Sequence, residues 1–241
     1  TTTFYDFLKP ENQGKKVYVC NGSVCHCAGT QDKLKADLKN HFEENEIGEM
    51  CCLGRCHENS AFQFNGNNYS AKSADELSEI IRSGAPSIDN YNVSSIGEPI
   101  LTREIKDLGY YKELLTRIFN SDRDLVLNEI KDSNLRGRGG AGFPIGMKLG
   151  FCKAEENDTK FVICNADEGD PGAFTDRYLL EERPFEVLAG MIIAGYVIGA
   201  EWGVVYIRGE YPESVLAIES AVEKLTEAGL IGDDVLGSSN K

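Results

Sequence analysis

The sequence predicts an α/β protein with two domains, and three observations lead to this prediction. The chain has 241 residues, which is enough for one large domain or two ordinary ones. The first 84 residues follow the order strand, helix, strand, strand, helix, which is typical of a compact α/β module. After residue 120, strands and helices alternate, as in a mainly parallel sheet. We therefore expect domains at 1–84 and 120–241, joined by a linker and a helical segment at 85–119.

The elements of the first domain follow from hydrophobic period and turn chemistry. Leu34, Leu38 and Phe42 recur at helical spacing. Asn-Gly between two short apolar runs marks a hairpin turn, while Ser73 can cap a helix that Gly84 then ends. The expected elements are a strand at 15–20, a helix at 31–45, a strand at 49–53, a hairpin at 61–71 and a helix at 74–82.

The second part of the chain begins with a linker, because residues 83–99 are poor in large apolar side chains and rich in turn formers. The apolar stretch from Val187 to Ala200 has 14 residues, which is too short to span a bilayer and suits a buried helix. The expected elements are helices within 100–132, a glycine-rich loop at 135–151, strands at 161–166 and 203–209, and helices at 184–200 and 212–228.

The charge balance excludes several classes of partner. The net charge of −14 argues against nucleic acid, because phosphate binding needs clustered Lys and Arg. It would also repel an anionic membrane surface. The first residues lack the basic and then apolar layout of a signal peptide. We expect a cytoplasmic protein with no nucleic-acid partner and no direct membrane insertion.

The cysteines predict a metal centre. Six of the eight cysteines lie between Cys20 and Cys56, and in a cytoplasmic protein such thiols are metal ligands more often than disulfides. Cys20 and Cys25 are spaced C-x4-C, and Cys52 and Cys56 are spaced C-x3-C, each pair where a strand gives way to a loop. Four thiolates suit a [2Fe–2S] cluster or tetrahedral zinc, and the wide spacings favour the cluster over zinc knuckles. A group of buried structural thiols is the third alternative.

The segments VCNGSVCHCAG and CCLGRCHENSAFQFNG resemble the thioredoxin-like [2Fe–2S] ferredoxins, over roughly residues 15–83. That family includes the small subunit beside the flavin subunit of respiratory complex I. The resemblance implies a thioredoxin-like fold and a cluster on Cys20, Cys25, Cys52 and Cys56. It implies that Cys52 is the third ligand and Cys51 is not, because the second cysteine of the doublet is the ligand in the family.

Two loops of the second domain suggest a nucleotide-like ligand. In the loop from Leu135 to Phe151, small residues let backbone N–H groups approach a flat or phosphorylated molecule, and Lys148 adds positive charge. The acidic loop CNADEGDPGAFTDR follows a strand, where ligands of open α/β sheets bind. A ligand-free flexible lid and a solvated surface turn are the alternatives for the two loops.

The run GRGGAGFP, the acidic loop, PFEVLAGMIIAGYVIGA and YIRGEYP resemble the FMN-binding, NADH-oxidising subunits of complex I and of NAD-linked hydrogenases and formate dehydrogenases. The resemblance runs from about residue 134 onward and implies the N-terminal part of an α/β, Rossmann-like domain that binds FMN and NAD(H). No protein side chain is implied as an acid, base or nucleophile. The implied FMN contacts are Gly137, Gly139, Lys148, Asn165, Asp167 and Glu168, and the implied NADH-side residues are Phe143, Phe151 and Asp170.

This resemblance implies an NADH dehydrogenase or NAD-reductase that exchanges hydride between NAD(H) and FMN and passes single electrons to iron–sulfur clusters. Its partners would be other Fe–S subunits of a hydrogenase, formate dehydrogenase or complex I type assembly. Later family motifs do not follow in this sequence, so we expect a further segment or polypeptide to complete the flavin domain before activity appears. The alternative is a non-catalytic, ferredoxin-like electron carrier or docking subunit that has lost flavin.

Overall fold

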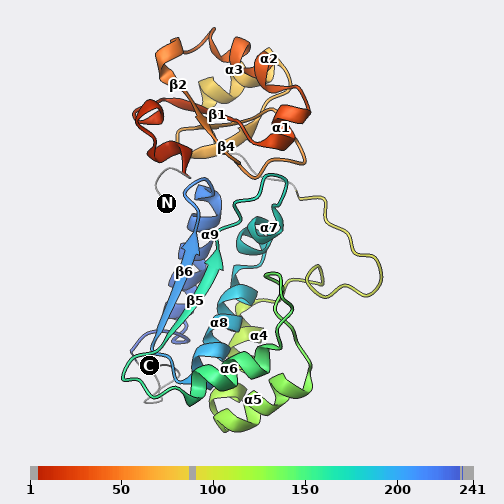
Figure 1. The fold of residues 1–241 in the computed structure, drawn as a ribbon, viewed down its shortest axis with the longest axis vertical. Coiled ribbons are helices and arrows are strands. Elements are labelled where there is room, and N and C mark those ends of the chain that lie inside the picture. The colour runs from red at the N-terminus through yellow and green to blue at the C-terminus, as the bar shows by residue number, and fades with distance from the viewer. Residues whose placement is uncertain (1–4, 87–90, 234, 236–241) are drawn as a thin grey trace. The chain divides into compact units, whose positions relative to one another are not determined.

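The structure is a computed structural model that describes residues 5–86, 91–233 and 235 (Figure 1). Its described residues form two compact units. The first unit is Thr1–Val93 with Asp167–Glu181 and Ile207–Leu216. The second unit is Ser94–Ala166, Glu182–Tyr206 and Ala217–Lys241. The acidic loop and the start of the last long helix therefore pack with the N-terminal sheet, although they come from the second half of the chain.

The first unit contains a four-stranded sheet in the order β2-β1-β3-β4. The strands are β1 Val17–Cys20, β2 Ile47–Met50, β3 Ala61–Phe64 and β4 Asn67–Ser70. Strands β1 and β2 are parallel, whereas β1 with β3 and β3 with β4 are antiparallel. The predicted hairpin forms with Asn65 and Gly66 in its turn, at φ values of 50° and 74°. These positive values match the tight primed turns that Asn-Gly favours.

The two faces of this sheet are covered differently because successive strand residues point to opposite sides. Val17 and Val19 face helices α2 (Gln31–Leu38) and α3 (Ala74–Ser83) in a core with Phe62 and Leu77. Cys20 belongs to a separate cluster with Cys25, Met50, Leu53 and Ala61, against which Phe7 and Tyr18 pack. The helices therefore bury one side of β1, while the cysteine side faces the loops.

Helix α3 forms where Ser73 and Gly84 predicted it. The Ser73 hydroxyl accepts a hydrogen bond from the Glu76 N–H at 3.2 Å, and Gly84 adopts φ 57° at the end of the helix. The Glu76 carboxylate accepts from the N–H of Lys72, one residue before the cap. The start and stop signals in the sequence are therefore confirmed for this helix.

Two boundaries in the first unit differ from the prediction. Helix α2 ends at Leu38 and not at residue 45, and Phe42 reaches the core from the following turn, with its ring 5.6 Å from that of Phe64. A side chain at helical spacing can thus join the core without being in the helix. The second strand lies two residues earlier than predicted, because Ile47 pairs with Val17 and the chain leaves the sheet after Met50. Short helix α1, Ser23–Cys27, was not predicted.

The second unit is mainly helical around a two-stranded sheet. Its elements are α4 Leu108–Phe119, α5 Arg123–Asp132, α6 Ile145–Ala154, β5 Phe161–Ala166, α8 Pro184–Ile198 and β6 Trp202–Ile207, with α9 Pro212–Glu227 entering it at Ala217. Helix α8 contacts α4, α5, α6 and β5, and its core includes Val197, Ile198, Ile118 and Leu127. Strands β5 and β6 run in the same direction (Figure 1).

Helices α6, Ile145–Ala154, and α7, Thr175–Glu182, were not predicted, and each begins inside a segment that the sequence predicted as a loop. Gly146 was interpreted as part of a loop, but it lies in α6 at a close contact between helices. A Cβ at this position would lie 2.8 Å from the Lys131 Cα atom. This glycine of the glycine-rich run therefore allows α6 to pack closely on α5. Among the described residues, no helix has both the length and the apolar content needed to cross a bilayer.

Candidate functional site

The four predicted ligand cysteines lie together because β1 and β2 are parallel neighbours. Cys20 ends β1 opposite Met50, the last residue of β2, so both following loops leave from the same edge of the sheet. Cys25 lies on α1, and Cys52 and Cys56 lie in the loop after β2. All four thiols are buried, with exposed fractions of 1%, 1%, 1% and 7% in sequence order. The structure thus brings all four into one group.

Contacts among the thiols confirm that they converge. The sulfur atoms of Cys52 and Cys56 are 3.2 Å apart, and Cys20 exchanges hydrogen bonds with both Cys25 and Cys52. Hydrogen bonds from Cys20 lower the pKa of Cys25 and of Cys52. The same interactions raise the pKa of Cys20, and the bond with Cys52 raises that of Cys56. These opposite shifts show that the four thiols interact with one another, as groups that share a site do.

The donor set fits an iron–sulfur cluster in its chemistry. Four cysteine sulfur atoms are the ligands that a [2Fe–2S] centre uses, and all four cysteines here are buried. Gly22 lies directly against this group, because a Cβ built at this position would lie 3.3 Å from the Cys52 Cβ atom and 3.4 Å from the Cys20 sulfur. In residues 5–86, 91–233 and 235, no group of three or more His, Cys, Asp or Glu side chains has the arrangement that holds a metal ion. The ligand assignment therefore remains a prediction.

The other two cysteines of the region lie at the margin of this group. Cys27 is exposed, and Cys51 is half-buried with a pKa raised chiefly by burial. That Cys27 and Cys51 do not bind the cluster stays a prediction. They do provide neighbours of the ligand residues against which the assignment can be checked.

The glycine-rich loop closes on itself immediately before α6. The Gly137 N–H donates to the Phe143 carbonyl at 2.9 Å, and Arg136 donates to the Gly142 carbonyl at 3.0 Å. No atom lies within 4 Å of a Cβ built at Gly139 or Gly142. Hydrogen bonds therefore join the two ends of the loop, while Gly139 and Gly142 are uncrowded. This arrangement suits the close approach of a flat or phosphorylated ligand.

The predicted ligand residues of the second unit lie on this loop, on α6 and on β5. Lys148 is exposed in the first turns of α6, and Asn165 is exposed near the end of β5. Phe143 and Phe151 are 46% and 60% exposed, and their ring centroids are 6.5 Å apart. Both rings are therefore accessible from solvent, and their contact with a nicotinamide stays a prediction.

Asp167, Glu168 and Asp170 belong to the first unit, and they differ in their surroundings. The Glu168 carboxylate accepts hydrogen bonds from the N–H groups of Thr175, Asp176 and Arg177, at 2.9 to 3.3 Å. It therefore caps the N-terminus of α7. Asp167 accepts a bond from Tyr5 at 3.1 Å, and Asp170 is exposed. The sequence did not predict that Glu168 has this structural task.

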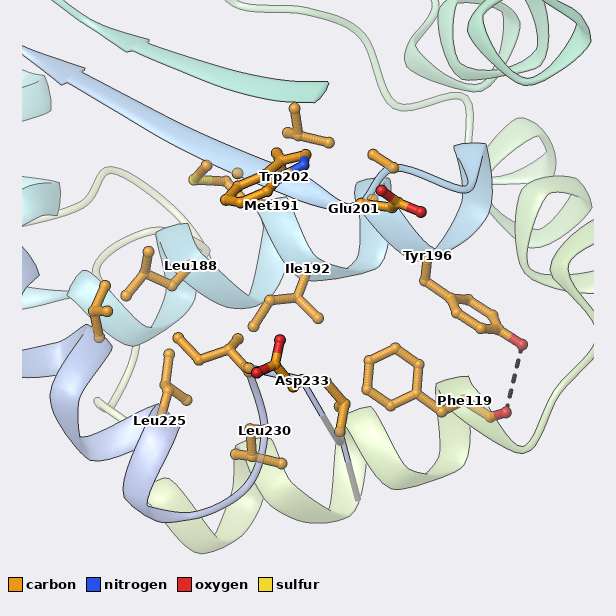
Figure 2. A pocket seen from close by; sticks show the side chains of 18 of the residues that line it. Phe119, Leu188, Met191, Ile192, Tyr196, Glu201, Trp202, Leu225, Leu230 and Asp233 are labelled. Carbon is orange, nitrogen blue, oxygen red and sulfur yellow. Dashed lines mark hydrogen bonds between the residues drawn. The ribbon is translucent and has the colours of Figure 1, made fainter. Parts of the chain in front are cut away.

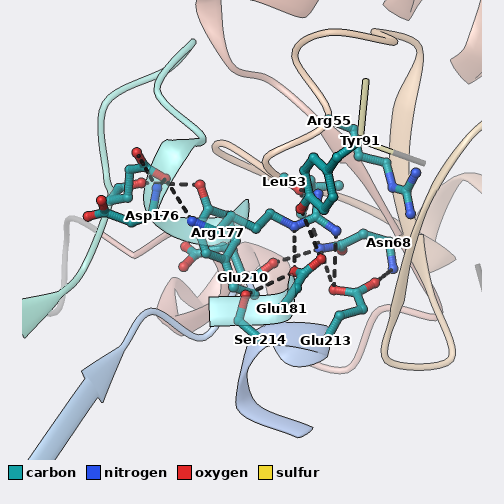
Figure 3. A network of polar contacts seen from close by, with 12 residues as sticks. Leu53, Arg55, Asn68, Tyr91, Asp176, Arg177, Glu181, Glu210, Glu213 and Ser214 are labelled. Atoms are coloured by element: carbon teal, nitrogen blue, oxygen red, sulfur yellow. Dashed lines mark hydrogen bonds and ion pairs between the residues drawn. The ribbon is translucent and has the colours of Figure 1, made fainter. Parts of the chain in front are cut away.

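Sequence reasoning also missed two buried arginines beside the cysteine loop. Arg208 is 2% exposed and donates to the carbonyl oxygens of Cys51 and Glu168, both at 2.6 Å. Arg177 is fully buried, donates to Glu181 at 2.8 Å and reaches the Leu53 carbonyl at 3.5 Å (Figure 3). Each arginine has acidic neighbours in sequence, as many exposed arginines do. Only the burial of the two side chains, which the sequence does not show, distinguishes them from surface arginines.

A mainly apolar pocket of about 450 Å³ lies in the second unit (Figure 2). Residues of α8 such as Leu188 and Ile192 line it together with Leu225 and Leu230 from the C-terminal part of the unit. Trp202 also lines it and is 60% exposed. The core of this unit is therefore open along one side.

Two family models match the chain. Residues 1–85 match the thioredoxin-like [2Fe–2S] ferredoxin family, and residues 130–236 match the Nuo51 FMN-binding domain. The first match contains the four thiols. The second contains the glycine-rich loop and the acidic loop.

Similar proteins share one or both of these parts. The NAD-reducing hydrogenase HoxS subunit alpha of Cupriavidus necator is 33% identical over 268 aligned residues, which cover 98% of this chain and 44% of that protein. The F 2 subunit of an NADH-quinone oxidoreductase from Rhizobium meliloti is 43% identical over 130 residues, covering 54% of this chain and 31% of that protein. A crystal structure of an NAD+-reducing [NiFe]-hydrogenase in the air-oxidized state superposes with a TM-score of 0.70 at 29% identity.

That structural match covers 95% of this chain and 43% of the other, so the chain spans less than half the length of these relatives. The match over nearly the whole chain confirms the predicted mixed α/β architecture. The chain therefore combines a match to the thioredoxin-like [2Fe–2S] ferredoxin family with a match to the Nuo51 FMN-binding domain, and its homologues are F subunits of NADH-quinone oxidoreductases and the alpha subunit of an NAD-reducing hydrogenase.

Proposed function

We propose that this chain is part of the NAD(H)-converting subunit of a multi-subunit redox enzyme, with a [2Fe–2S] cluster on Cys20, Cys25, Cys52 and Cys56. The observation that carries the proposal is the convergence of four buried thiols in a chain that also contains the family's flavin loops. A cluster there would carry one electron at a time, and bound FMN would exchange a hydride with the nicotinamide.

The flavin site we propose uses the residues predicted from the family. The open glycine loop at Gly137 and Gly139 would present N–H groups to the phosphate, and Lys148 would add charge. Asn165 and Asp167 would contact the remaining polar groups of the flavin. Glu168 would act there mainly by shaping the acidic loop, because its carboxylate oxygens are occupied by the α7 N-terminus. Phe143, Phe151 and Asp170 would lie on the NADH side.

We propose that further polypeptide completes the flavin domain and that activity requires it. Phe161 and Ile163 of β5 are 54% and 66% exposed, and Trp202 and Tyr206 of β6 are 60% and 48% exposed. A face of this kind, next to an open apolar pocket, is unfavourable in water. The 44% coverage of the hydrogenase subunit leaves ample sequence to cover it. Residues 120–241 would then be the N-terminal part of that domain, after the ferredoxin domain at 1–84 and the linker and helical segment at 85–119.

The partners we propose are the Fe–S subunits of a hydrogenase, formate dehydrogenase or complex I type assembly. The names of the relatives support a multi-subunit partner of this chemical class. We also propose a cytoplasmic location, because eight cysteines of which six lie close together in sequence suit metal binding in a reducing compartment.

The cysteine doublet provides the sharpest test of the cluster. Iron and sulfide analysis of the purified chain should give about two of each per polypeptide, with the electron paramagnetic resonance signal of a reduced [2Fe–2S] centre. Cys52→Ser should abolish the signal, whereas Cys51→Ser should retain it. One zinc per chain, or the opposite outcome for the doublet, would contradict the assignment.

Flavin binding is tested in the completed subunit with a matched pair on α6. Lys148→Ala should weaken FMN about 10- to 100-fold, because a charge-assisted hydrogen bond is worth about 1.5–3 kcal/mol. Lys153→Ala is the control, since Lys153 pairs with Asp124 at 2.5 Å. NADH:ferricyanide activity should fall with the first variant only. A completed subunit that holds the cluster but neither flavin nor activity would favour the electron-carrier alternative.

The fluorescence of the single tryptophan can show whether further polypeptide covers the β5–β6 face of the flavin domain. Trp202 is the only tryptophan in the chain and is 60% exposed on β6. When the completing polypeptide is present, the Trp202 emission maximum should move to shorter wavelength. An unchanged emission spectrum in the completed protein would contradict our account of the β5–β6 face.

A further inference from the structure

Two buried guanidinium groups lie on either side of ligand residue Cys52. Arg208 donates to the carbonyl of Cys51, the residue before it, and Arg177 reaches the carbonyl of Leu53, the residue after it. Both arginines come from segments about 120 to 160 positions later in the chain, within the same compact unit. The residues before and after Cys52 are therefore each contacted by a buried guanidinium group.

The arginines are held in place by a shared set of partners. Arg208 pairs with Glu210 at 3.1 Å, and Arg177 pairs with Glu181 at 2.8 Å. The ring of Tyr211 lies beside both, with its centroid 5.0 Å from the Arg208 guanidinium carbon and 5.8 Å from that of Arg177. Both side chains are therefore positioned by packing as well as by charge.

Asn68 and Gly54 extend the same arrangement. The Asn68 amide donates to the carbonyls of Leu53 and Glu210, at 3.4 and 2.8 Å (Figure 3). A Cβ at Gly54 would lie 2.8 Å from the Arg177 Cδ atom, so the missing side chain makes room for this arginine. The loop that carries the third ligand is thus contacted by Asn68 from the ferredoxin sequence and by Arg177 and Arg208 from the later part of the chain.

Stability alone is a weak reason for two buried arginines. Removing a guanidinium from water is costly, and well-packed apolar residues of similar volume are often equally stabilising. A positive charge close to a redox centre has a different consequence. When a cluster takes up one electron, its negative charge grows by one unit, and nearby fixed positive charge stabilises that reduced form.

We propose that Arg177 and Arg208 are positioning residues of the iron–sulfur site, which hold the Cys51–Gly54 main chain and raise the reduction potential of the cluster. The inference rests on the proposed cluster assignment. In the reaction concerned, the oxidised cluster gains one electron from its donor and no bond to a cysteine sulfur breaks. Arg208 is the residue chosen for the test, because it makes the shorter bond to the loop and its acidic partner Glu210 can be varied separately.

The test is a redox titration of the cluster in the purified chain, followed by electron paramagnetic resonance, with dithionite as the electron donor. Arg208→Gln should lower the midpoint potential, so that the reduced-to-oxidised ratio at a fixed potential falls at least tenfold, which is about 59 mV for one electron. Arg208→Lys keeps the charge and should lower it less. Glu210→Gln removes the paired negative charge and should raise the potential. Arg82→Gln is the control, because the Arg82 side chain is 77% exposed on α3.

The sign of these shifts separates the proposal from a purely structural role, which gives no reason for Arg208 and Glu210 variants to move the potential in opposite directions. If Arg208→Gln fails to hold iron, Arg208→Lys and Glu210→Gln decide the question. Equal potentials in these variants and in the wild type would overturn the inference. A wild-type chain without a [2Fe–2S] signal would instead refute the cluster assignment, so the two failures are distinct.

Discussion

Replacing Glu168 with alanine should loosen the start of helix α7. The Glu168 carboxylate accepts from the N–H groups of Thr175, Asp176 and Arg177 and from the Thr175 hydroxyl. Helix N-termini leave such N–H groups without partners inside the helix. Loss of this one carboxylate would therefore free several donors of α7 at once.

The size of the effect follows from these contacts. Loss of a capping acceptor costs about 0.5–2 kcal/mol, and loss of a negative charge at a helix N-terminus costs about 0.3–1 kcal/mol, more where the site is partly buried. Glu168 is only 9% exposed, so the upper part of each range applies. We expect about 2–3 kcal/mol for Glu168→Ala. Glu168→Gln keeps one oxygen acceptor and should cost about 1 kcal/mol.

Native-state hydrogen exchange of the flavin-free chain measures this locally and avoids assuming that two units unfold together. A cost of about 1.4 kcal/mol corresponds to about tenfold faster exchange. The amides of residues 175–177 should therefore exchange tens to a hundred times faster in Glu168→Ala. Asp170→Ala is the control, because this exposed carboxylate lies in the same loop. Unchanged protection of 175–177 together with lost flavin binding in the completed subunit would refute the capping role.

Two further changes test the conformation and electrostatics of the first unit. Gly54→Ala and Gly14→Ala both place a side chain at positive φ, 71° and 72°, which costs about 1–2 kcal/mol. Only Gly54 is crowded by Arg177, so its variant should cost about 1–3 kcal/mol more in denaturant unfolding, and equal costs would contradict the close approach. Burial and then the Glu168 charge raise the pKa of Asp176 in the folded chain. Folded protein therefore binds this proton more tightly than unfolded protein, and stability falls as pH rises from the ordinary pKa through the raised one. Asp176→Asn should be more stable than wild type, by a margin that grows as the pH rises above the ordinary aspartate pKa of about 4, and a margin independent of pH would argue against a buried carboxylate.

Local signals predicted the ferredoxin elements well, and the reasons are visible in the structure. Ser73, Gly84 and the Asn65–Gly66 turn act through their own backbone conformations, so their roles can be predicted without the rest of the fold. The end of α2 was harder, because Phe42 joins the core from a turn and imitates helical periodicity. The helices after the glycine-rich and acidic loops were missed because their sequences contain the small and polar residues of loops.

The flavin residues show a second limit of sequence reasoning. Gly146 and Glu168 lie in the two loops that resemble a cofactor site, yet one permits helix packing and the other caps α7. A sequence motif therefore does not show whether a residue contacts the ligand or stabilises the fold around it. Distances to Lys131 and to the Thr175 N–H group distinguish these two uses.

The sequence by itself determined the α/β class, and it predicted the two domains and the four-cysteine set, because spacing, period and motifs are properties of neighbouring residues. Only the tertiary structure decided which groups surround those cysteines. Arg177 and Arg208 are distant in sequence from Cys52, and burial of their charges depends on partners brought together by folding. Electrostatic surroundings are set by distances through space, which no local pattern in the chain records.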